Sequence, residues 1–369
     1  MIQQKTAQFP APDSDPFYAP IGAIGRSGDL RRVREIDLGS EVTAWQLRYL
    51  SSNSFGRSTV PSGTVIVPRE PYPGQRPIVC YGTSVHGLDR NCAPSYLIRQ
   101  GTEPEIPLIN RVLEHGWAVA IPDGEGLGAG GPHTLLAGAA AGHTLLDIAR
   151  AAQLLPDAKL ADAPVSIWGY SAGGRAAAWA AELQPSYAPE LELRVVVAGG
   201  VPADPNVLIQ ANMDSPYQGL AFATLVGLSA AYQHLPLRDV LNETGRSAAE
   251  RAEHEDLAGL LVNYAQPLTA YTERPDPWDS PHWRQVLQAE RSGKHCPAVP
   301  VHLYHGTDDV PCPISMGRTL AEGYRALGAT VTWTELATDH LRGIVKGAGL
   351  ALDALAHHLS SDTRASDVA

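Results

Sequence analysis

The sequence predicts an α/β fold, with a mostly parallel central sheet covered by helices on both faces. Short apolar runs, typical of buried strands, alternate with helical stretches along most of the 369 residues. Apolar residues make up 44% of the chain and charged residues only 18%, which excludes a disordered protein and a coiled coil.

The expected elements follow one another in a regular order. After a Pro-rich, irregular N-terminus, a β-rich region covers 44–68, and its last strand, 64–67, stops at Pro68. Further strands are expected at 77–81, 117–121, 164–168, 195–197, 299–304 and 330–334. Helices are expected at 105–116, 138–155, 174–183, 314–327 and 345–359.

The alternation of strands and helices fails in one long segment. Between about residues 204 and 294 the chain is mostly helical, with helices expected at 207–231 and 248–264 and no strand. An insertion between consecutive core strands suggests a helical cap, or lid. We therefore expect an α/β core made of 1–204 and 297–369, and an inserted cap domain over 205–296.

Several other classes of protein and site are disfavoured. The net charge of −11 repels phosphate backbones, so no nucleic-acid partner is expected. No apolar run is long enough for a transmembrane segment. The glycine-rich stretch 126–131 precedes Pro132, which delays the following helix, so a dinucleotide site is not expected. The HxxH pair His302 and His305 would point to opposite faces of a strand. The four cysteines lack CxxC spacing, so no zinc site is expected and their disulfide state stays open: Cys80, Cys92, Cys296 and Cys312.

One pentapeptide indicates a nucleophile. Gly169-Tyr170-Ser171-Ala172-Gly173 lies directly between an expected strand and an expected helix. A serine on such a tight turn exposes its hydroxyl at the carboxyl edge of the sheet, and small residues two positions away let the strand and helix approach closely. Ser171 is therefore the candidate nucleophile.

A serine nucleophile needs a histidine base held by a carboxylate, and in this type of sheet the chain order is Ser, acid, His. His340 follows the last expected strand, in a loop over 336–340, which is where a base would reach the edge of the sheet. The acid is expected one strand earlier, where Asp308 and Asp309 are both candidates. Asp339 is expected to face solvent.

With these residues assembled, the chain resembles the secretory lipase family of α/β-hydrolases, a microbial group with lid-bearing members. The match extends over most of the chain, and several of its motifs are specific to the family. These are Asp15-Pro16-Phe17-Tyr18, Asn91-Cys92-Ala93-Pro94-Ser95-Tyr96, Glu125-Gly126-Leu127-Gly128, Gly169-Tyr170-Ser171-Ala172-Gly173-Gly174 and Gly199-Gly200-Val201-Pro202-Ala203-Asp204.

The resemblance implies roles for individual residues. The acid loop of the family reads His-Gly-x-x-Asp with a proline four residues after the aspartate, which selects Asp309 and is matched by Pro313. Ser171, Asp309 and His340 are then the nucleophile, the orienting acid and the base. The oxyanion is expected to be held by the backbone N–H of Ala172 and by a second donor from Thr83, Ser84 or Val85. The spacing from this segment to Cys92 is longer than in the family.

The resemblance also implies an activity. We expect a serine hydrolase that cleaves carboxylic esters, as a lipase or esterase, through an acyl-enzyme and without metal or organic cofactor. Its partner would be a small-molecule ester or lipid, with transient contact to a lipid interface. The alternatives are an amide, peptide or small-molecule deacylase on the same triad, or an inactive binding scaffold. Acyl-chain length, natural substrate and oligomeric state stay open.

Two further expectations concern the location and the pocket. The family implies secretion, but the start of the chain shows no apolar signal-peptide core, so a cytoplasmic location stays open. Apolar residues of the insertion are expected either to shape an acyl pocket or to pack as ordinary helix core. They are Leu208, Ile209, Leu220, Phe222, Leu225, Val226 and Leu228.

Overall fold

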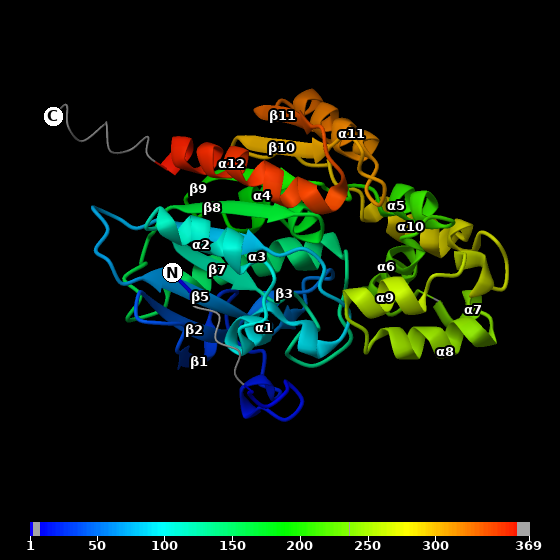
Figure 1. Cartoon of the computed structure of the whole chain (residues 1–369), viewed down its shortest axis with the longest axis horizontal. Helices are drawn as coiled ribbons and strands as arrows, with labels where there is room; N and C mark the ends of the chain where they lie inside the picture. Colours follow the sequence, from blue (N-terminus) through cyan, green and yellow to red (C-terminus); the bar gives the residue numbers. More distant parts are fainter. Residues whose placement is uncertain (3–7, 236, 360–369) are drawn as a thin grey trace.

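The computed structural model describes residues 1–2, 8–235 and 237–359, which form a nine-stranded sheet in the order β1-β2-β5-β7-β6-β8-β9-β10-β11 (Figure 1). The six strands from β7 to β11 in this order pair in parallel, and the first three pair antiparallel with their neighbours. The predicted α/β fold with a mostly parallel sheet is therefore confirmed. The strands are β1 (Leu30–Ile36), β2 (Val42–Tyr49), β5 (Ser62–Pro68), β6 (Ile78–Gly82), β7 (Ala118–Pro122), β8 (Val165–Tyr170), β9 (Leu193–Gly199), β10 (Val301–Gly306) and β11 (Val331–Leu336), beside a separate short pair, β3 (Ser51–Ser52) and β4 (Ser58–Thr59).

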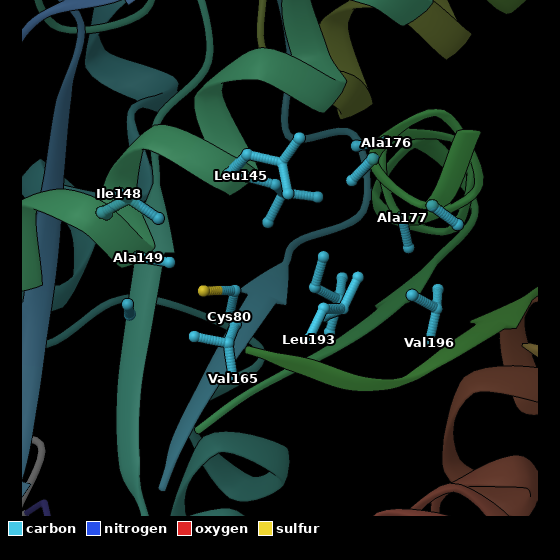
Figure 2. Close-up of a cluster of buried hydrophobic side chains, with 14 of the residues drawn as sticks. Cys80, Leu145, Ile148, Ala149, Val165, Ala176, Ala177, Leu193 and Val196 are labelled. Atoms are coloured by element: carbon cyan, nitrogen blue, oxygen red, sulfur yellow. The ribbon is translucent and has the colours of Figure 1, made fainter. Parts of the chain in front are cut away.

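Helices cover both faces of the sheet. One layer consists of α3 (Gly138–Gln153), α4 (Ala172–Tyr187) and α11 (Ile314–Ala326), and its buried side chains form one cluster with alternate residues of the strands (Figure 2). The opposite layer consists of α2 (Ile106–Glu114) and α12 (His340–Leu359). A further short helix, α1 (Pro94–Gln100), packs against β5 and β7.

The register of β8 explains why its sequence is apolar throughout. Val165 and Ile167 belong to the cluster with α3 and α4, whereas Trp168 and Tyr170 belong to the cluster with α12. Because successive side chains of a strand point to opposite faces, a strand covered on both sides needs apolar residues at every position. The elements that position the site are therefore held by two cores at once.

The structure differs from the sequence prediction in several elements. Strand β1 was not predicted, because four of its seven residues are charged; it is an edge strand that pairs only with β2. The helix expected over 207–231 is two helices, α5 (Pro205–Asn212) and α6 (Gln218–Ala231). The helix expected over 248–264 is also divided, into α8 (Glu243–Ala252) and α9 (Leu257–Asn263), where Asp256 accepts a hydrogen bond from Gly259 N–H and caps the second helix.

The helical segment between β9 and β10 lies together beyond one end of the sheet, at the right of Figure 1. Besides α5, α6, α8 and α9 it contains α7 (Leu237–Val240) and α10 (Pro281–Ala289), and these helices share their own buried apolar cluster. That this segment is a separate cap domain over 205–296 stays a prediction. Parts of the predicted core, 3–7 and 360–369, lie outside the described residues, as does part of the N-terminus expected to be irregular. No helix among the described residues is long and apolar enough to cross a membrane.

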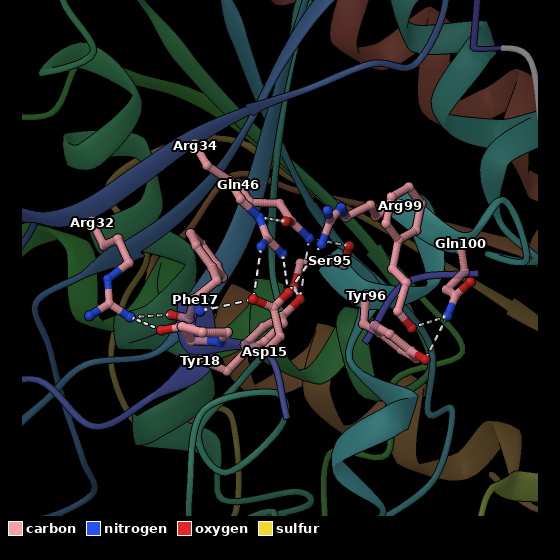
Figure 3. A network of polar contacts seen from close by, with 12 residues as sticks. Asp15, Phe17, Tyr18, Arg32, Arg34, Gln46, Ser95, Tyr96, Arg99 and Gln100 are labelled. Carbon is pink, nitrogen blue, oxygen red and sulfur yellow. Dashed lines mark hydrogen bonds and ion pairs between the residues drawn. The ribbon is translucent and has the colours of Figure 1, made fainter. Parts of the chain in front are cut away.

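The N-terminal segment is fastened to the sheet by the carboxylate of Asp15 (Figure 3). Asp15 accepts hydrogen bonds from Arg34 at 2.7 Å and 3.0 Å, from Arg99 at 3.1 Å, and from the backbone N–H of Phe17 at 2.9 Å. Burial by itself would raise the pKa of Asp15, but the hydrogen bonds and charges of these partners lower it below the ordinary value. The Asp15-Pro16-Phe17-Tyr18 motif therefore serves as an anchor.

Replacing Asp15 by Ala should lower the free energy of unfolding by about 1–3 kcal/mol at neutral pH, because two arginines lose their acceptor. A carboxylate whose pKa is lowered in the folded state stabilises the protein above the unfolded pKa of about 3.9 and loses this effect as the pH falls further. The difference between wild type and D15A in urea unfolding should therefore shrink below about pH 4. Asp13→Ala, which removes an exposed pair with Arg90, is the control and should change little. A D15A protein as stable as wild type at pH 7 would contradict the anchor.

Candidate active site

Ser171 lies on the turn between β8 and α4, in a backbone conformation that non-glycine residues rarely adopt. Its φ is +56° and its ψ is −120°. Such a conformation costs on the order of 1–3 kcal/mol and persists only where the surrounding structure enforces it. Here Ser171 N–H donates to Gly199 O at 2.9 Å, and Arg175 N–H, one helical turn later, donates to Ser171 O at 2.9 Å. The turn thus presents the hydroxyl at the carboxyl edge of the sheet.

The glycines around Ser171 are required by close backbone contacts. A Cβ at Gly169 would overlap the carbonyl of Gly173, and a Cβ at Gly173 would overlap the carbonyl of Gly82 at the end of β6. A Cβ at Gly174 would likewise overlap the carbonyl of Gly199 at the end of β9. The first turn of α4 is therefore pressed against the ends of three neighbouring strands, as the small residues in the sequence predict.

The structure brings Ser171, His340 and Asp309 together from the ends of β8, β11 and β10. His340 Nε2 lies 2.9 Å from Ser171 Oγ, and His340 Nδ1 lies 2.6 Å from Asp309 Oδ2. An ionised carboxylate can only accept, so Nδ1 carries the hydrogen and Nε2 is free to accept from the serine hydroxyl. All three residues are buried. The arrangement can remove a proton from Ser171 and stabilise the resulting imidazolium.

The surroundings of Asp309 keep its carboxylate ionised. Burial would raise its pKa, but hydrogen bonds from His305 and His340 lower it below the ordinary value. Its Oδ1 also accepts from Cys312 N–H at 2.8 Å. The acidic residues next to Asp309 and His340 in the sequence lie outside this contact. Asp308 is exposed in a turn, and Asp339 is half-buried and accepts a hydrogen bond from Arg342 N–H at 2.9 Å.

The placement of His340 differs from the expected loop, because His340 is the first residue of α12 rather than a loop residue before a helix at 345. Asp339 caps this helix through its bond from Arg342 N–H, which moves the helix start forward. Tyr170 fixes the same helix end: its hydroxyl donates to His340 O at 2.7 Å, and its ring lies 5.2 Å from the imidazole. Sequence reasoning missed Tyr170, because nothing in the pentapeptide distinguishes that position.

The candidate oxyanion donors lie around the start of α4 and the end of β6. Ala172 is the first residue of α4, where backbone N–H groups have no partner within the helix. Thr83, Ser84 and Val85 directly follow β6. Ser84 N–H donates to Glu105 Oε1 at 2.9 Å and is engaged in this conformation. Thr83 and Val85 are therefore the better placed candidates for the second donor.

A buried polar network supports this segment. Glu105 accepts from Tyr81 OH at 2.5 Å as well as from Ser84, and its pKa is raised by burial. The neighbouring Glu103 lies 2.9 Å from His86 Nε2; burial would lower the pKa of His86, but the bonds and charge of Glu103 raise it to about 9. Sequence reasoning missed this network, because the pairing of residues 81–86 with residues 103–105 depends on how the two segments pack and belongs to no motif.

A cavity of about 30 Å³, enough for a water molecule, adjoins Ser171 and His340. Its lining includes Ser171, His340 and Cys312, together with three residues of the helical insertion: Leu208, Leu220 and Thr224. A second cavity of about 80 Å³ lies beyond Leu135 and Leu136, which line both. Two of the seven apolar residues expected at an acyl pocket thus line the site. The other five pack in the core of the insertion: Ile209, Phe222, Leu225, Val226 and Leu228.

The paired histidines and the cysteines noted in the sequence lie in the following surroundings. His302 Nε2 lies 3.2 Å from His358 Nε2, whereas His305 lies on the other face of β10 against Asp309. Cys80, Cys92, Cys296 and Cys312 are all free thiols. Asp309, Cys312 and His340 each have an atom that could bind a metal ion, and these three atoms lie within 4.8 Å of one another. The hydrogen bonds of Asp309 to the other two residues already account for this short separation.

The sheet order and the serine turn define an α/β-hydrolase fold, and comparisons with known proteins agree. The structure is similar to Candida antarctica lipase A in its closed state, with a TM-score of 0.84, 26% identity, and coverage of 92% of this chain and 84% of that one. The sequence is 30% identical to a probable inactive lipase, MT1628, of Mycobacterium tuberculosis, over 89% of this chain and 78% of the relative. It is 28% identical to the secreted triacylglycerol lipase LIP2 of Malassezia furfur, over 88% of this chain and 73% of the relative.

The secretory lipase family matches residues 94–367. The chain belongs to the secretory lipase family, as its sequence motifs indicated, and the family and its structural neighbours support hydrolysis of carboxylic esters.

Gly173→Ala should destabilise the protein by about 1–3 kcal/mol and move the first turn of α4 away from the end of β6, because the new methyl group overlaps Gly82 O. Gly349→Ala is the matched control on α12, where nothing lies within 4 Å of the added Cβ; it should stabilise slightly, through higher helix propensity. Thermal unfolding of both variants checks the prediction. Equal melting temperatures for G173A and wild type would show that the close contact is not needed.

Proposed function

We propose that this protein is a serine esterase or lipase that works through Ser171, His340 and Asp309. The observation that carries the proposal is the position of the His340 imidazole, 2.9 Å from Ser171 Oγ and 2.6 Å from Asp309 Oδ2, on a fold shared with lipases. A binding scaffold has no need of a buried serine on a strained turn, within reach of a base that is itself oriented by a buried acid. We therefore propose that this chain is active, although one relative is named a probable inactive lipase.

The geometry supports a reaction in two halves. His340 Nε2 takes the proton of Ser171 as Oγ attacks the ester carbonyl, and Asp309 stabilises the imidazolium that forms. The N–H of Ala172 and a second N–H, from Thr83 or Val85, hold the oxyanion. The imidazolium then gives its proton to the leaving alcohol, which leaves an acyl-enzyme on Ser171. Water, deprotonated by His340, attacks the acyl group, and the proton returns to Ser171 Oγ as the acid is released.

The helical insertion is proposed to act as a lid. Leu208, Leu220 and Thr224 line the small cavity beside Ser171, and we propose that their helices move to admit an ester larger than this cavity. Three apolar side chains near the site are exposed: Val310 follows Asp309, and Leu341 and Val345 follow His340 on α12. We propose that these residues support transient contact with a lipid interface, and that the protein is exported as its Malassezia furfur relative is.

Ser171→Ala should lower the turnover of a p-nitrophenyl ester by about 10⁴-fold or more with the fold retained, because the covalent route is lost. The measurement is kcat on a series of p-nitrophenyl esters of increasing acyl length and on the matching anilide, for wild type and S171A. The wild type should favour the ester over the anilide. Near-normal esterase activity in S171A would reject the nucleophile, and a preference for the anilide would reject the reaction class.

A further inference from the structure

A second histidine lies against the carboxylate of Asp309. His305 is the penultimate residue of β10 and is 1% exposed. Its Nε2 lies 2.7 Å from Cys312 O and 3.2 Å from Asp309 Oδ2, the same oxygen that meets His340. His305 does not line the cavity beside Ser171, so it would act on the reaction only through Asp309.

The contacts of His305 determine which nitrogen carries the hydrogen. A carbonyl oxygen can only accept, so Nε2 must donate to Cys312 O, and Asp309 Oδ2 lies 3.2 Å from the same nitrogen. Nδ1 is buried and has no hydrogen-bond partner among the described residues. A Cβ at Gly317 would lie 2.7 Å from this nitrogen, so the glycine leaves room for the bare ring edge. A hydrogen on Nδ1 would be a buried donor without an acceptor, so the contacts favour the tautomer with its hydrogen on Nε2.

We propose that His305 is a positioning residue that fixes the orientation of Asp309 toward His340, an inference that rests on the proposed function. Cys312 N–H donates to one oxygen of the carboxylate at 2.8 Å, and the N–H of His305 lies against the other, with Nε2 3.2 Å from Oδ2. Because these two N–H groups have fixed positions, they restrict the carboxylate to one orientation. In this orientation Oδ2 also faces His340 Nδ1. With His305 removed, the carboxylate keeps only one fixed donor and can turn about it.

His305 also affects the charge that His340 meets. Its N–H shares part of the negative charge of Oδ2, so the attraction of that oxygen for His340 Nδ1–H is weakened. In those molecules in which Oδ2 still faces His340 Nδ1, loss of this donor therefore favours the imidazolium form of His340. In a pH–rate profile, this effect moves the acid limb of kcat/KM to higher pH, which a purely structural defect would not do.

The experiment compares His305→Leu, which removes the donor, with His305→Gln, whose amide nitrogen can occupy the position of Nε2. His302→Gln is the matched control, because His302 is on the same strand but faces His358 on the other side of the sheet. For each variant, kcat and KM for a p-nitrophenyl ester are measured across pH, together with thermal unfolding. The signal of the hydrogen between His340 and Asp309 is followed by proton NMR and assigned by its loss in His340→Ala.

In H305L we expect kcat to fall by about 10- to 100-fold, a range typical of a misplaced catalytic group, with KM nearly unchanged. The acid limb should move to higher pH, and the NMR signal should shift. H305Q should recover most of kcat, and H302Q should match wild type. A folded H305L with wild-type kcat and acid limb would overturn the proposal, as would a loss of kcat with an unmoved limb and no recovery in H305Q. The NMR signal needs no substrate, so a wild type without esterase activity would overturn the proposed function but still leave the positioning of Asp309 open to this measurement.

Discussion

The imidazole of His340 meets two partners at once, and this double contact sets the demands on the rest of the molecule. One ring edge is 2.6 Å from Asp309 and the other 2.9 Å from Ser171, although the three residues are far apart in the chain. Parallel strands solve this problem because their carboxyl ends share one edge of the sheet. Each of the three residues follows the carboxyl end of one strand, β8, β10 or β11. The buried apolar clusters on the two faces of the sheet keep these strands in place.

The contact also requires strain and close packing. Ser171 keeps a left-handed φ because glycines at 169, 173 and 174 let the first turn of α4 lie directly on the strand ends. Tyr170, the residue before the serine, donates from its hydroxyl to His340 O, which links the turn to the start of α12. The arrangement is present without any substrate, which would lower the reorganisation needed during the proposed reaction.

The sequence predicted the parts of the fold that rest on local patterns. Strands such as β8 are apolar throughout because both faces are covered, and the glycines around Ser171 mark a close approach. Sequence reasoning missed β1, whose charged residues suit an edge strand. It also placed the start of α12 too late, because the helix cap from Asp339 is a single side-chain contact. His305, Tyr170 and the Glu103–His86 pair depend on tertiary contacts that no short motif encodes. For residues 308 and 309, periodicity does not distinguish the two acids; the family's acid-loop motif selected Asp309, and in the structure Asp309 is buried and Asp308 exposed.

The central claim is that His340 and Asp309 activate one serine. The most direct test is to treat the protein with a fluorophosphonate, which reacts covalently with an activated serine, and to locate the adduct by mass spectrometry of the digested protein. The account predicts one adduct per chain, on Ser171, and a strong loss of labelling when His340 is replaced by Ala. An unlabelled protein, or a label on any other residue, would contradict it.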